Sequence, residues 1–269
     1  LLSYLGISVL AYSSPMGKLQ RVASICWIPD FQHIYLPNLF PKKEVLKRNK
    51  LFKSYIKNST IILLSSNSAR NDLKKFSPKV VKNLRILKFV SCNSFKSKIL
   101  GFNEIEEKYN IPKSYFHLPN QFWKHKNHKL VAQAVALLNN KKIHCNVICT
   151  GNIYDYRNPE FFSSFLELLK VLNVEKQFII LGIIPYEDMI SLMNYSQSVI
   201  NPSLFEGWST SVEESKILNK KILLSDIPVH KEQNPIKGKF FSPSSPLELA
   251  EQMENIINDS GINSDCSIN

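Results

Sequence analysis

Residues 178–200, FIILGIIPYEDMISLMNYSQSVI, contain two short apolar runs with a helix pattern between them. The runs at 178–181 and 198–200 have the length and composition of strands, and the apolar spacing over 189–195 is that of a helix. A strand, a helix and a second strand in this order form the repeating unit of a parallel sheet, whose crossover connections are right-handed. This stretch therefore predicts an α/β fold.

The same alternation extends in both directions along the chain. Further strands are predicted at residues 60–65, 86–90, 115–118, 143–149 and 222–224. Further helices are predicted at residues 72–76, capped by 66–68, and at 130–138, 161–172 and 212–218. The run at 60–65 is typical of a strand covered on both faces, and the polar, unpatterned residues 91–113 predict an inter-domain linker. The alternation indicates a doubly wound parallel sheet, which binds ligands at the carboxyl ends of its strands.

With 269 residues, the chain has room for one large or two ordinary domains. Its 44% hydrophobic content, with only 8 Gly and 14 Pro, excludes a disordered or collagen-like protein. No run approaches the roughly 20 apolar residues of a transmembrane helix. Residues 1–10 lack the basic start of a signal peptide and an initiating Met, so we expect the sequence to begin inside a fold.

The cysteines are odd in number and scattered: Cys26, Cys92, Cys145, Cys149 and Cys266. In a chain long enough to bury its own core, this pattern predicts reduced thiols in a cytosolic protein. His144 with Cys145 and Cys149 suggests metal ligands, but residues 143–149 also have a strand pattern, in which a thiol is a small buried apolar group. No zinc-type spacing occurs, so we expect no metal site.

Charge is distributed unevenly along the chain. Residues 1–111 hold 19 Lys and Arg against 6 Asp and Glu, a net of +13, whereas residues 112–269 hold 15 against 16, a net of −1. The densest basic cluster is Lys42, Lys43, Lys47, Arg48, Lys50, Lys53 and Lys57. Between these lie apolar residues expected on one side of a helix: Val45, Leu46, Leu51, Phe52 and Ile56.

Three interpretations of this basic helix remain open. It suits an anionic membrane surface, it suits a nucleic acid or another polyanion, or its lysines only solvate a face whose apolar side is core. No zinc finger, RNP motif or helix-turn-helix pattern is present, so nucleic acid is the least favoured of the three.

Three predicted strand-to-helix loops are rich in polar and aromatic residues: 119–128, 182–186 and 201–214. In the third, residues 209–211 can cap the following helix, whose free N–H groups and positive dipole end form an anion site. Lys126 can bring a point charge to the same phosphate. Glu206 and Glu214 can face one cleft. Taken alone, each feature is more often structural, as a cap, a dipole partner or a packing aromatic.

Together, these segments resemble a known family. Residues 205–214, FEGWSTSVEE, resemble the Glu-x7-Glu signature of retaining, nucleotide-sugar-dependent glycosyltransferases of the GT-B fold, the group 1 (family 4) enzymes. Residues 119–128 resemble the donor-phosphate loop of that family, and residues 181–186 resemble its loop beside the nucleobase. Three further segments match in order and spacing, at residues 27–33, 64–68 and 225–233. The resemblance covers about residues 20–250.

The resemblance implies an α/β, GT-B-like chain with two Rossmann-like doubly wound domains. Residues 1–111 would form a partial amino-terminal, acceptor-side domain with its linker, residues 112–257 the donor-binding domain, and residues 258–269 a polar tail. The family begins with a strand and a Gly-rich loop, and nothing before Trp27 resembles them. The first domain is therefore expected to be incomplete.

The implied activity is that of a retaining glycosyltransferase of the hexosyltransferase type. It would move a sugar from a nucleotide diphosphate sugar to a glycan or lipid-linked acceptor. By resemblance, Glu206 is expected to contact the donor sugar, and Asp30 and His33 to face the acceptor. These three are the expected catalytic residues.

The expected donor-binding residues lie in the three loops: Asn120, Gln121, Lys124, Lys126, Ile184, Gly207, Ser209, Thr210 and Glu214. Glu214 would hold the ribose hydroxyls, and Glu213 would point away from the cleft. Gln121 stands where the family commonly has an Arg, so Lys124 or Lys126 is expected to carry more of the phosphate charge. No metal or other cofactor is expected, because Lys126 and the helix terminus at 209–211 would stabilise the departing diphosphate.

Two other functions remain as alternatives. One is a non-catalytic or decayed fragment that keeps its nucleotide affinity, and the other is a nucleic-acid-binding protein attracted through the basic half. The favoured partners are a nucleotide-sugar donor, a glycan or lipid-linked acceptor and an anionic membrane surface, without nucleic acid. The expected location is cytoplasmic, peripheral on the inner face of the membrane.

Overall fold

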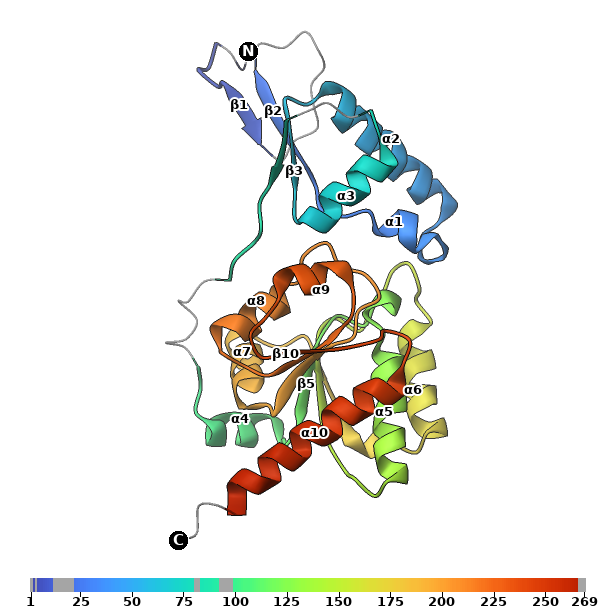
Figure 1. Cartoon of the computed structure of the whole chain (residues 1–269), viewed down its shortest axis with the longest axis vertical. Helices are drawn as coiled ribbons and strands as arrows, with labels where there is room; N and C mark the ends of the chain where they lie inside the picture. Colours follow the sequence, from blue (N-terminus) through green and yellow to red (C-terminus); the bar gives the residue numbers. More distant parts are fainter. Residues whose placement is uncertain (1, 3, 12–21, 80–82, 92–98, 266–269) are drawn as a thin grey trace. The chain divides into compact units, whose positions relative to one another are not determined.

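The computed structural model describes residues 2, 4–11, 22–79, 83–91 and 99–265 (Figure 1). The chain divides into two compact units, Leu1–Phe89 with Phe205–Trp208, and Val90–Leu204 with Ser209–Asn269. Within the described residues, the first unit is built on a four-stranded sheet and the second on a six-stranded sheet. All strand pairs in both sheets are parallel. The predicted α/β class is confirmed.

The described part of the first unit is a parallel sheet wound in one direction. Its strands, in hydrogen-bonded order, are β1 (Val9–Ala11), β2 (Ala23–Ile28), β3 (Ile61–Leu64) and β4 (Asn83–Ile86). Its helices are α1 (Gln32–Tyr35), the 3-10 turn η1 (Pro37–Leu39), α2 (Lys42–Asn58) and α3 (Asn67–Phe76). Because successive right-handed crossovers run in the same direction, α2 and α3 lie on the same face of the sheet (Figure 1).

That winding decides which face of the first sheet is covered. Ile62 and Leu64 of β3 are buried in the core under α2 and α3. Ile61 and Leu63, on the opposite face of the same strand, are only half-buried. The prediction that residues 60–65 are covered on both faces is therefore wrong for the part of the first unit that the structure describes.

The basic helix predicted from the charge cluster is confirmed as α2. Its exposed lysines are Lys42, Lys43, Lys47, Lys50, Lys53 and Lys57. Phe52 is buried, whereas Leu46 is 69% exposed and Leu51 is 37% exposed. At 3.6 residues per turn, these leucines lie on either side of the Phe52 face and cannot share it. The predicted single apolar side is therefore wrong for both leucines.

The second unit contains alternating strands and helices along its whole length. Its strands are β5 (Phe116–Pro119), β6 (Val147–Thr150), β7 (Phe178–Gly182), β8 (Ser198–Asn201), β9 (Ile222–Ser225) and β10 (Gly238–Phe241). Its helices are α4 (Phe102–Tyr109), α5 (His128–Asn140), α6 (Phe161–Val171), α7 (Tyr186–Tyr195), α8 (Thr210–Ile217), α9 (Pro228–Gln233) and α10 (Pro246–Asp265). Two 3-10 turns, η3 (Lys124–Lys126) and η4 (Glu175–Gln177), complete it.

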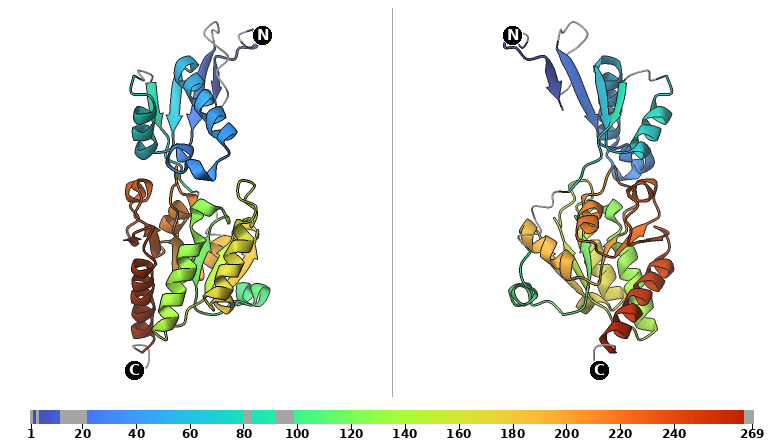
Figure 2. Two further views of the ribbon diagram at one scale, coloured as in Figure 1. Left: turned by 90° about the vertical axis from the view of Figure 1, so that its right-hand side faces the viewer. Right: turned by 60° about the vertical axis from the view of Figure 1, so that its left-hand side comes forward.

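The strand order of this sheet is β10-β9-β8-β5-β6-β7. The chain runs outward from β5 through β6 to β7 and then returns to the other side of β5, where it continues through β8, β9 and β10. Helices consequently cover both faces, with α5, α6 and α10 on one core and α7 and α8 on another. Figure 2 shows α10 lying alongside α5. This order is that of a dinucleotide-binding Rossmann domain.

Burial in the second unit follows from the two covered faces. All four residues of β6, β8 and β9 are buried. Strands buried on both sides appear in sequence as continuous apolar runs. The predicted double winding is confirmed for this unit.

Two expected boundaries differ from the structure. The segment 91–113, expected to be a linker, contains α4, whose Ile105 is buried against the second unit. Lys108 of α4 also pairs with Asp188 of α7 at 2.7 Å. The helix α10 continues to Asp265, so residues 258–265 are helical rather than part of a polar tail. No helix within the described residues is long and apolar enough to cross a membrane.

Three of the cysteines, Cys26, Cys145 and Cys149, are buried thiols that form no disulfide within the described residues. Burial raises the pKa of the Cys145 thiol to about 12, so it stays protonated and unreactive at neutral pH. The other two, Cys92 and Cys266, lie outside the described residues.

Candidate functional site

The strand order reverses between β5 and β8, because strands are added on one side of β5 up to β7 and on its other side from β8 onward. This switch point marks the candidate site. At such a switch point the loops after two neighbouring strands separate and leave a crevice at their carboxyl ends. Two hydrogen bonds join the two loops here. The amide of Leu204 donates to the carbonyl of His125 at 2.8 Å, and the side-chain amide of Asn127 donates to the carbonyl of Pro202 at 3.1 Å. The segments 119–128 and 201–214, singled out in the sequence, therefore meet in the folded chain.

The loop after β5 begins with Asn120, whose carbonyl oxygen accepts a hydrogen bond from the first residue of α5. His128 is fully buried, and its Nε2 donates to that carbonyl at 3.2 Å. Burial lowers the pKa of His128 to about 3, so the ring is neutral at ordinary pH. The Nδ2 group of Asn120 is buried and has no hydrogen-bond partner among the described residues. An unpaired buried amide at the carboxyl end of a strand is a donor available to a ligand.

The loop after β6 approaches Asn120 so closely that only glycine fits at Gly151. A Cβ atom there would lie 2.8 Å from both the backbone carbon and the oxygen of Asn120, and the φ angle of Gly151 is +134°. Gly151→Ala is therefore expected to destabilise the fold by about 1–3 kcal/mol. A lower Tm in thermal denaturation would show this.

Gly101→Ala is the matched control, because a Cβ at Gly101 has nothing within 4 Å. Equal Tm values for the two variants would contradict the close approach of the two loops.

The remaining predicted residues of this loop are the phosphate-binding candidates. Lys124 and Lys126 lie in η3, where Lys124 is exposed and Lys126 is half-buried. Gln121 is exposed. The loop thus places two ammonium groups and one amide near the carboxyl end of β5.

The start of α8 is fixed by side chains that sequence analysis did not single out. Asn201 Nδ2 donates to the hydroxyls of Ser209 and Ser211 at 2.8 and 3.2 Å. Gln233 of α9 bonds the backbone of Ser209 from the other side, donating to its carbonyl at 2.8 Å. Ser209 is the N-cap residue as predicted, but its hydroxyl makes no capping hydrogen bond to the helix.

The hydroxyl of Ser209 is thus occupied by Asn201. Thr210, the first residue of α8, is exposed. The predicted side-chain cap is wrong, and an anion would be bound through backbone N–H groups of this turn rather than through the Ser209 hydroxyl.

Glu214 lies in the second turn of α8 and is 7% exposed. Its Oε1 accepts a hydrogen bond from the Tyr186 hydroxyl at 2.9 Å, which joins α8 to the first residue of α7. Burial raises the pKa of Glu214, and the bond from Tyr186 opposes that shift. Ile184, in the loop before α7, is half-buried against the neighbouring core. The structure therefore places Tyr186, which sequence analysis missed, on the predicted ribose-binding carboxylate.

Glu213, which is expected to point away from the cleft, is held by two neighbouring side chains. It is buried, its Oε2 lies 3.0 Å from Lys216 Nζ, and its Oε1 accepts from Gln233 Nε2 at 2.9 Å. Lys216 and Gln233 thus fix Glu213 near the start of α8, and its direction relative to the cleft stays a prediction.

The expected catalytic residues Asp30 and His33 belong to the first unit, in the segment after β2. Asp30 Oδ1 accepts from the amide of Gln32 at 2.9 Å and lies 3.8 Å from Arg48. His33 is fully buried among aromatic rings, and the centre of its ring lies 5.4 Å from the centre of the Phe52 ring. Its Nε2 lies 3.1 Å from Asn49 Oδ1. A ring with no exposed surface argues against the expected contact with an acceptor. Burial also lowers the pKa of His33.

Glu206 and Gly207 lie in the short segment Phe205–Trp208, between β8 and α8, which groups with the first unit. Glu206 is half-buried. Their expected contacts with a donor sugar stay predictions.

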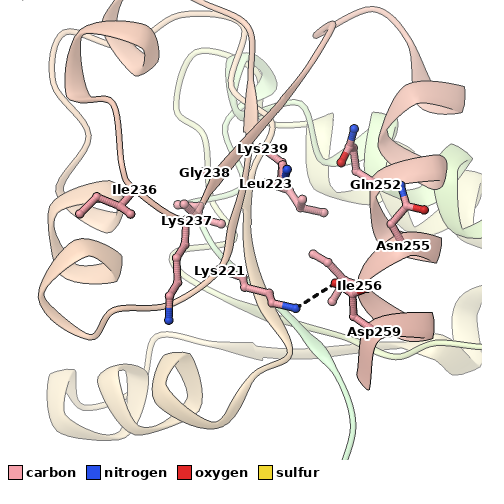
Figure 3. Close-up of a pocket in the computed structure, with 11 residues that line it drawn as sticks. Lys221, Leu223, Ile236, Lys237, Gly238, Lys239, Gln252, Asn255, Ile256 and Asp259 are labelled. Atoms are coloured by element: carbon pink, nitrogen blue, oxygen red, sulfur yellow. Dashed lines mark hydrogen bonds and ion pairs between the residues drawn. The ribbon is translucent and has the colours of Figure 1, made fainter. Parts of the chain in front are cut away.

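A separate cavity of about 620 Å³ lies between the β9–β10 edge of the second sheet and α10 (Figure 3). It is lined by the first residues of the two strands, Ile222 and Gly238, and by three lysines, of which Lys221 pairs with Asp259 at 3.3 Å. The first residues of parallel strands are at the opposite end from their carboxyl ends. This cavity is therefore not part of the candidate site.

Within the described residues, no group of three or more His, Cys, Asp or Glu side chains has the arrangement of a metal site. In the loop after β5, the positive charge is that of the Lys124 and Lys126 side chains.

Comparison with known proteins assigns these features to a family. The family model described as "Glycosyl transferases group 1" matches residues 102–269, more than half of the chain. No curated protein matches the sequence.

Solved structures show the same fold at low sequence identity. Anabaena Alr3699/HepE, solved with UDP and glucose, is 14% identical with a TM-score of 0.73, over 90% of this chain and 64% of that one. A glycosyltransferase from Rickettsia africae ESF-5 is 16% identical with a TM-score of 0.73, over 97% and 69%. WaaG, a glycosyltransferase involved in lipopolysaccharide biosynthesis, is 14% identical with a TM-score of 0.72, over 97% and 71%.

These similarities confirm the Rossmann-like GT-B fold class predicted from the sequence. The chain spans about 64% of the length of HepE.

Proposed function

Because the chain belongs to the group 1 glycosyltransferases, we propose that it transfers a glycosyl group from a nucleotide diphosphate sugar to an acceptor, with retention of configuration. The observation that carries this proposal is the pair of hydrogen-bonded loops at the β5–β8 switch point. The HepE structure, which holds UDP and glucose, supports a nucleoside diphosphate as the leaving group.

The chemistry of the step requires stabilisation of negative charge. When the bond from the anomeric carbon to the diphosphate oxygen breaks, the electron pair stays on the diphosphate. Lysine ammonium groups and backbone N–H groups held in a fixed loop stabilise such charge without reorganising. Lys126, Lys124 and the amide of Asn120 lie in one loop that the second unit holds in place. We propose that these groups replace a metal ion in this role.

The two ends of the donor would be bound by different elements. The diphosphate would lie against the loop after β5 and the first turn of α8, while the ribose would meet the carboxylate of Glu214. Tyr186 supports this assignment, because its hydroxyl fixes the orientation of that carboxylate. Glu206 would contact the transferred sugar, and Asp30 would face the acceptor.

The proposal is tested by calorimetric titration with UDP, GDP and ADP, followed by incubation with the matching sugar donors. Binding of a nucleoside diphosphate together with donor turnover supports it, and NMR of the product's anomeric proton reports retention. Binding without turnover indicates the non-catalytic alternative, and no nucleotide binding contradicts the proposal.

We further propose that the acceptor is lipid-linked and that α2 docks the chain on an anionic membrane. The exposed lysines of α2 stand beside Leu46 and Leu51, two exposed apolar side chains that the core does not use. Basic residues with neighbouring apolar ones are typical of helices that lie on anionic membranes. Each lysine near such a surface contributes roughly 1 kcal/mol, reduced by salt over a Debye length of about 8 Å. The peripheral, cytoplasmic location stays a prediction.

Substitution of Lys43, Lys47 and Lys50 by Gln is expected to lower binding to anionic vesicles by about tenfold after salt screening. Co-sedimentation with vesicles of phosphatidylcholine and phosphatidylglycerol measures this, with salt as a second variable. The control replaces three exposed lysines of the second unit, Lys113, Lys170 and Lys176, for the same loss of charge. Equal losses for both triple variants, or binding to neutral vesicles, would refute docking through α2.

A further inference from the structure

A buried ion pair lies beneath the loop that carries the candidate phosphate-binding lysines. The side chains of Asp155 and Arg157 are 1% and 2% exposed, and Arg157 Nε lies 3.6 Å from Asp155 Oδ1. Both residues belong to the loop after β6. Burying two opposite charges costs desolvation free energy, and such a pair often adds little to stability. A role of this pair other than packing is therefore expected.

The contacts of the pair indicate that role. The Arg157 guanidinium lies 4.4 Å from the centre of the Trp123 ring, and that ring meets His125 edge-on at 5.7 Å. Asp155 Oδ2 accepts a hydrogen bond from the backbone amide of Lys124 at 3.4 Å. Both members of the pair therefore contact the segment between Trp123 and Lys126.

The carboxylate of Asp155 is itself held in place. Its Oδ1 accepts from the amide of Arg157 at 3.0 Å, and its Oδ2 accepts from Asn158 Nδ2 at 3.3 Å. The amide of Phe122 also donates to the carbonyl of Asn152 at 2.8 Å, which joins the two loops one residue before Trp123. The loop after β5 thus contacts the loop after β6 from Phe122 to Lys124.

Arg157 is too well covered to meet a ligand itself. Its guanidinium lies between Asp155 and the Trp123 ring, and only 2% of its side chain is exposed. Any influence on a bound phosphate must pass through the position of Trp123 and the residues that follow it. This distinguishes it from Lys126, which is half-buried and lies on the loop itself.

We propose that Asp155 and Arg157 are positioning residues that hold the segment 123–126 so that Lys126 faces the diphosphate of the donor. This inference rests on the proposed function, since it gives the loop a diphosphate to bind. Loss of the pair would leave the ribose and base contacts intact and weaken only the diphosphate contacts.

The experiment is a double-mutant cycle on the full chain, with UDP and uridine as the two probes. Arg157→Met is expected to weaken UDP binding about tenfold and to change uridine binding less than twofold. In a Lys126→Ala background, the same substitution is expected to change UDP binding less than twofold, because the group that it positions is gone. Calorimetric titration measures all eight affinities.

Arg157→Lys is a second variant that tests the same role if Arg157→Met does not fold. It keeps a positive charge opposite Asp155 but loses the planar group that stacks on Trp123. We expect this variant to melt close to the wild type and still to lose several-fold of the preference for UDP over uridine.

Gln177→Ala is the control for a purely structural effect. Gln177 bonds Asn139 and the carbonyl of Cys145, before the start of β6 and away from the candidate site. It is expected to lower the Tm and to leave the UDP-to-uridine ratio unchanged.

The outcomes separate the two levels of inference. Equal losses for UDP and uridine, or additive effects of Arg157→Met and Lys126→Ala, would overturn the positioning role and leave the proposed function standing. A wild-type protein that binds UDP no more tightly than uridine would overturn the proposed function and this inference with it.

Discussion

Lys126→Ala is expected to weaken UDP binding by about 10- to 150-fold and to leave uridine binding unchanged. The reason is that a hydrogen bond to a charged group contributes about 1.5–3 kcal/mol, and each 1.36 kcal/mol is a factor of ten. Uridine lacks the diphosphate that Lys126 would neutralise. Calorimetric titration with both ligands measures the two effects side by side. The affinity for UDP is also expected to persist in EDTA, because we assign the positive charge to the protein.

Lys129→Ala is the matched control for this substitution. Lys129 lies three residues further along, in the first turn of α5, where its ammonium group lies 5.8 Å from the centre of the Phe161 ring. It removes the same charge from the same region and is expected to change UDP binding less than twofold. Equal losses for UDP and uridine in Lys126→Ala, or loss of wild-type binding in EDTA, would refute the assignment.

Glu214→Gln is expected to weaken the binding of both uridine and UDP by at least about tenfold, since both ligands contain the ribose. The ligand-free variant is expected to have an unchanged or higher Tm. Gln keeps an oxygen that accepts from Tyr186 while removing a buried charge that costs stability at neutral pH. Weaker binding without a loss of stability identifies a functional carboxylate, because the substitution of a purely structural residue would lower both binding and stability. Unchanged uridine affinity would remove the assignment.

The raised pKa of Glu214 gives this prediction a pH dependence with a definite sign. Uridine affinity is expected to fall as the pH decreases, beginning above the range in which an ordinary Glu titrates, because the carboxylate is the form that accepts from the ribose. For ligand-free stability the sign is opposite. The folded state binds this proton more tightly than the unfolded state, so the contribution is present at low pH and is lost as the pH rises through the raised pKa.

Tyr186→Phe tests the same group from the other side. Removing the hydroxyl that opposes the pKa shift is expected to move the pH profile of uridine binding upward. Glu214→Gln is expected to abolish the profile. An unchanged profile in both variants would show that another group titrates.

Local sequence patterns determined most of the elements of the second unit. The runs that became β5, β6, β8 and β9 are almost entirely buried, and such strands are visible as apolar runs without any knowledge of their neighbours. The helix α4 was not predicted, because its apolar residues are few and lie in a charged segment: Phe102, Ile105 and Tyr109. Its stability comes from packing against α7, including the contact of Lys108 with Asp188.

For the candidate site, sequence determined which residues are available and tertiary structure determined which of them are free to act. The motifs at 119–128 and 201–214 were recognisable because residue type and spacing are local properties. No local pattern shows that His33 is enclosed by aromatic rings or that Glu213 is held by Lys216 and Gln233. Their accessibility depends on partners elsewhere in the fold.

Asp155 and Arg157 show the same division most clearly. In sequence, an Asp-Tyr-Arg run in a loop after a strand is an ordinary polar segment, and exposed charges are the rule in loops. Sequence by itself determined the alternating elements, the parallel sheet of the second unit and the residue types in its loops. Only the tertiary structure decided that β5 lies next to β8, that the loop after β6 supports the loop after β5, and that this ion pair is buried under Trp123. The physical reason is that periodicity and propensity act within a few residues of the chain, whereas burial and charge pairing depend on strand order, which brings distant segments together.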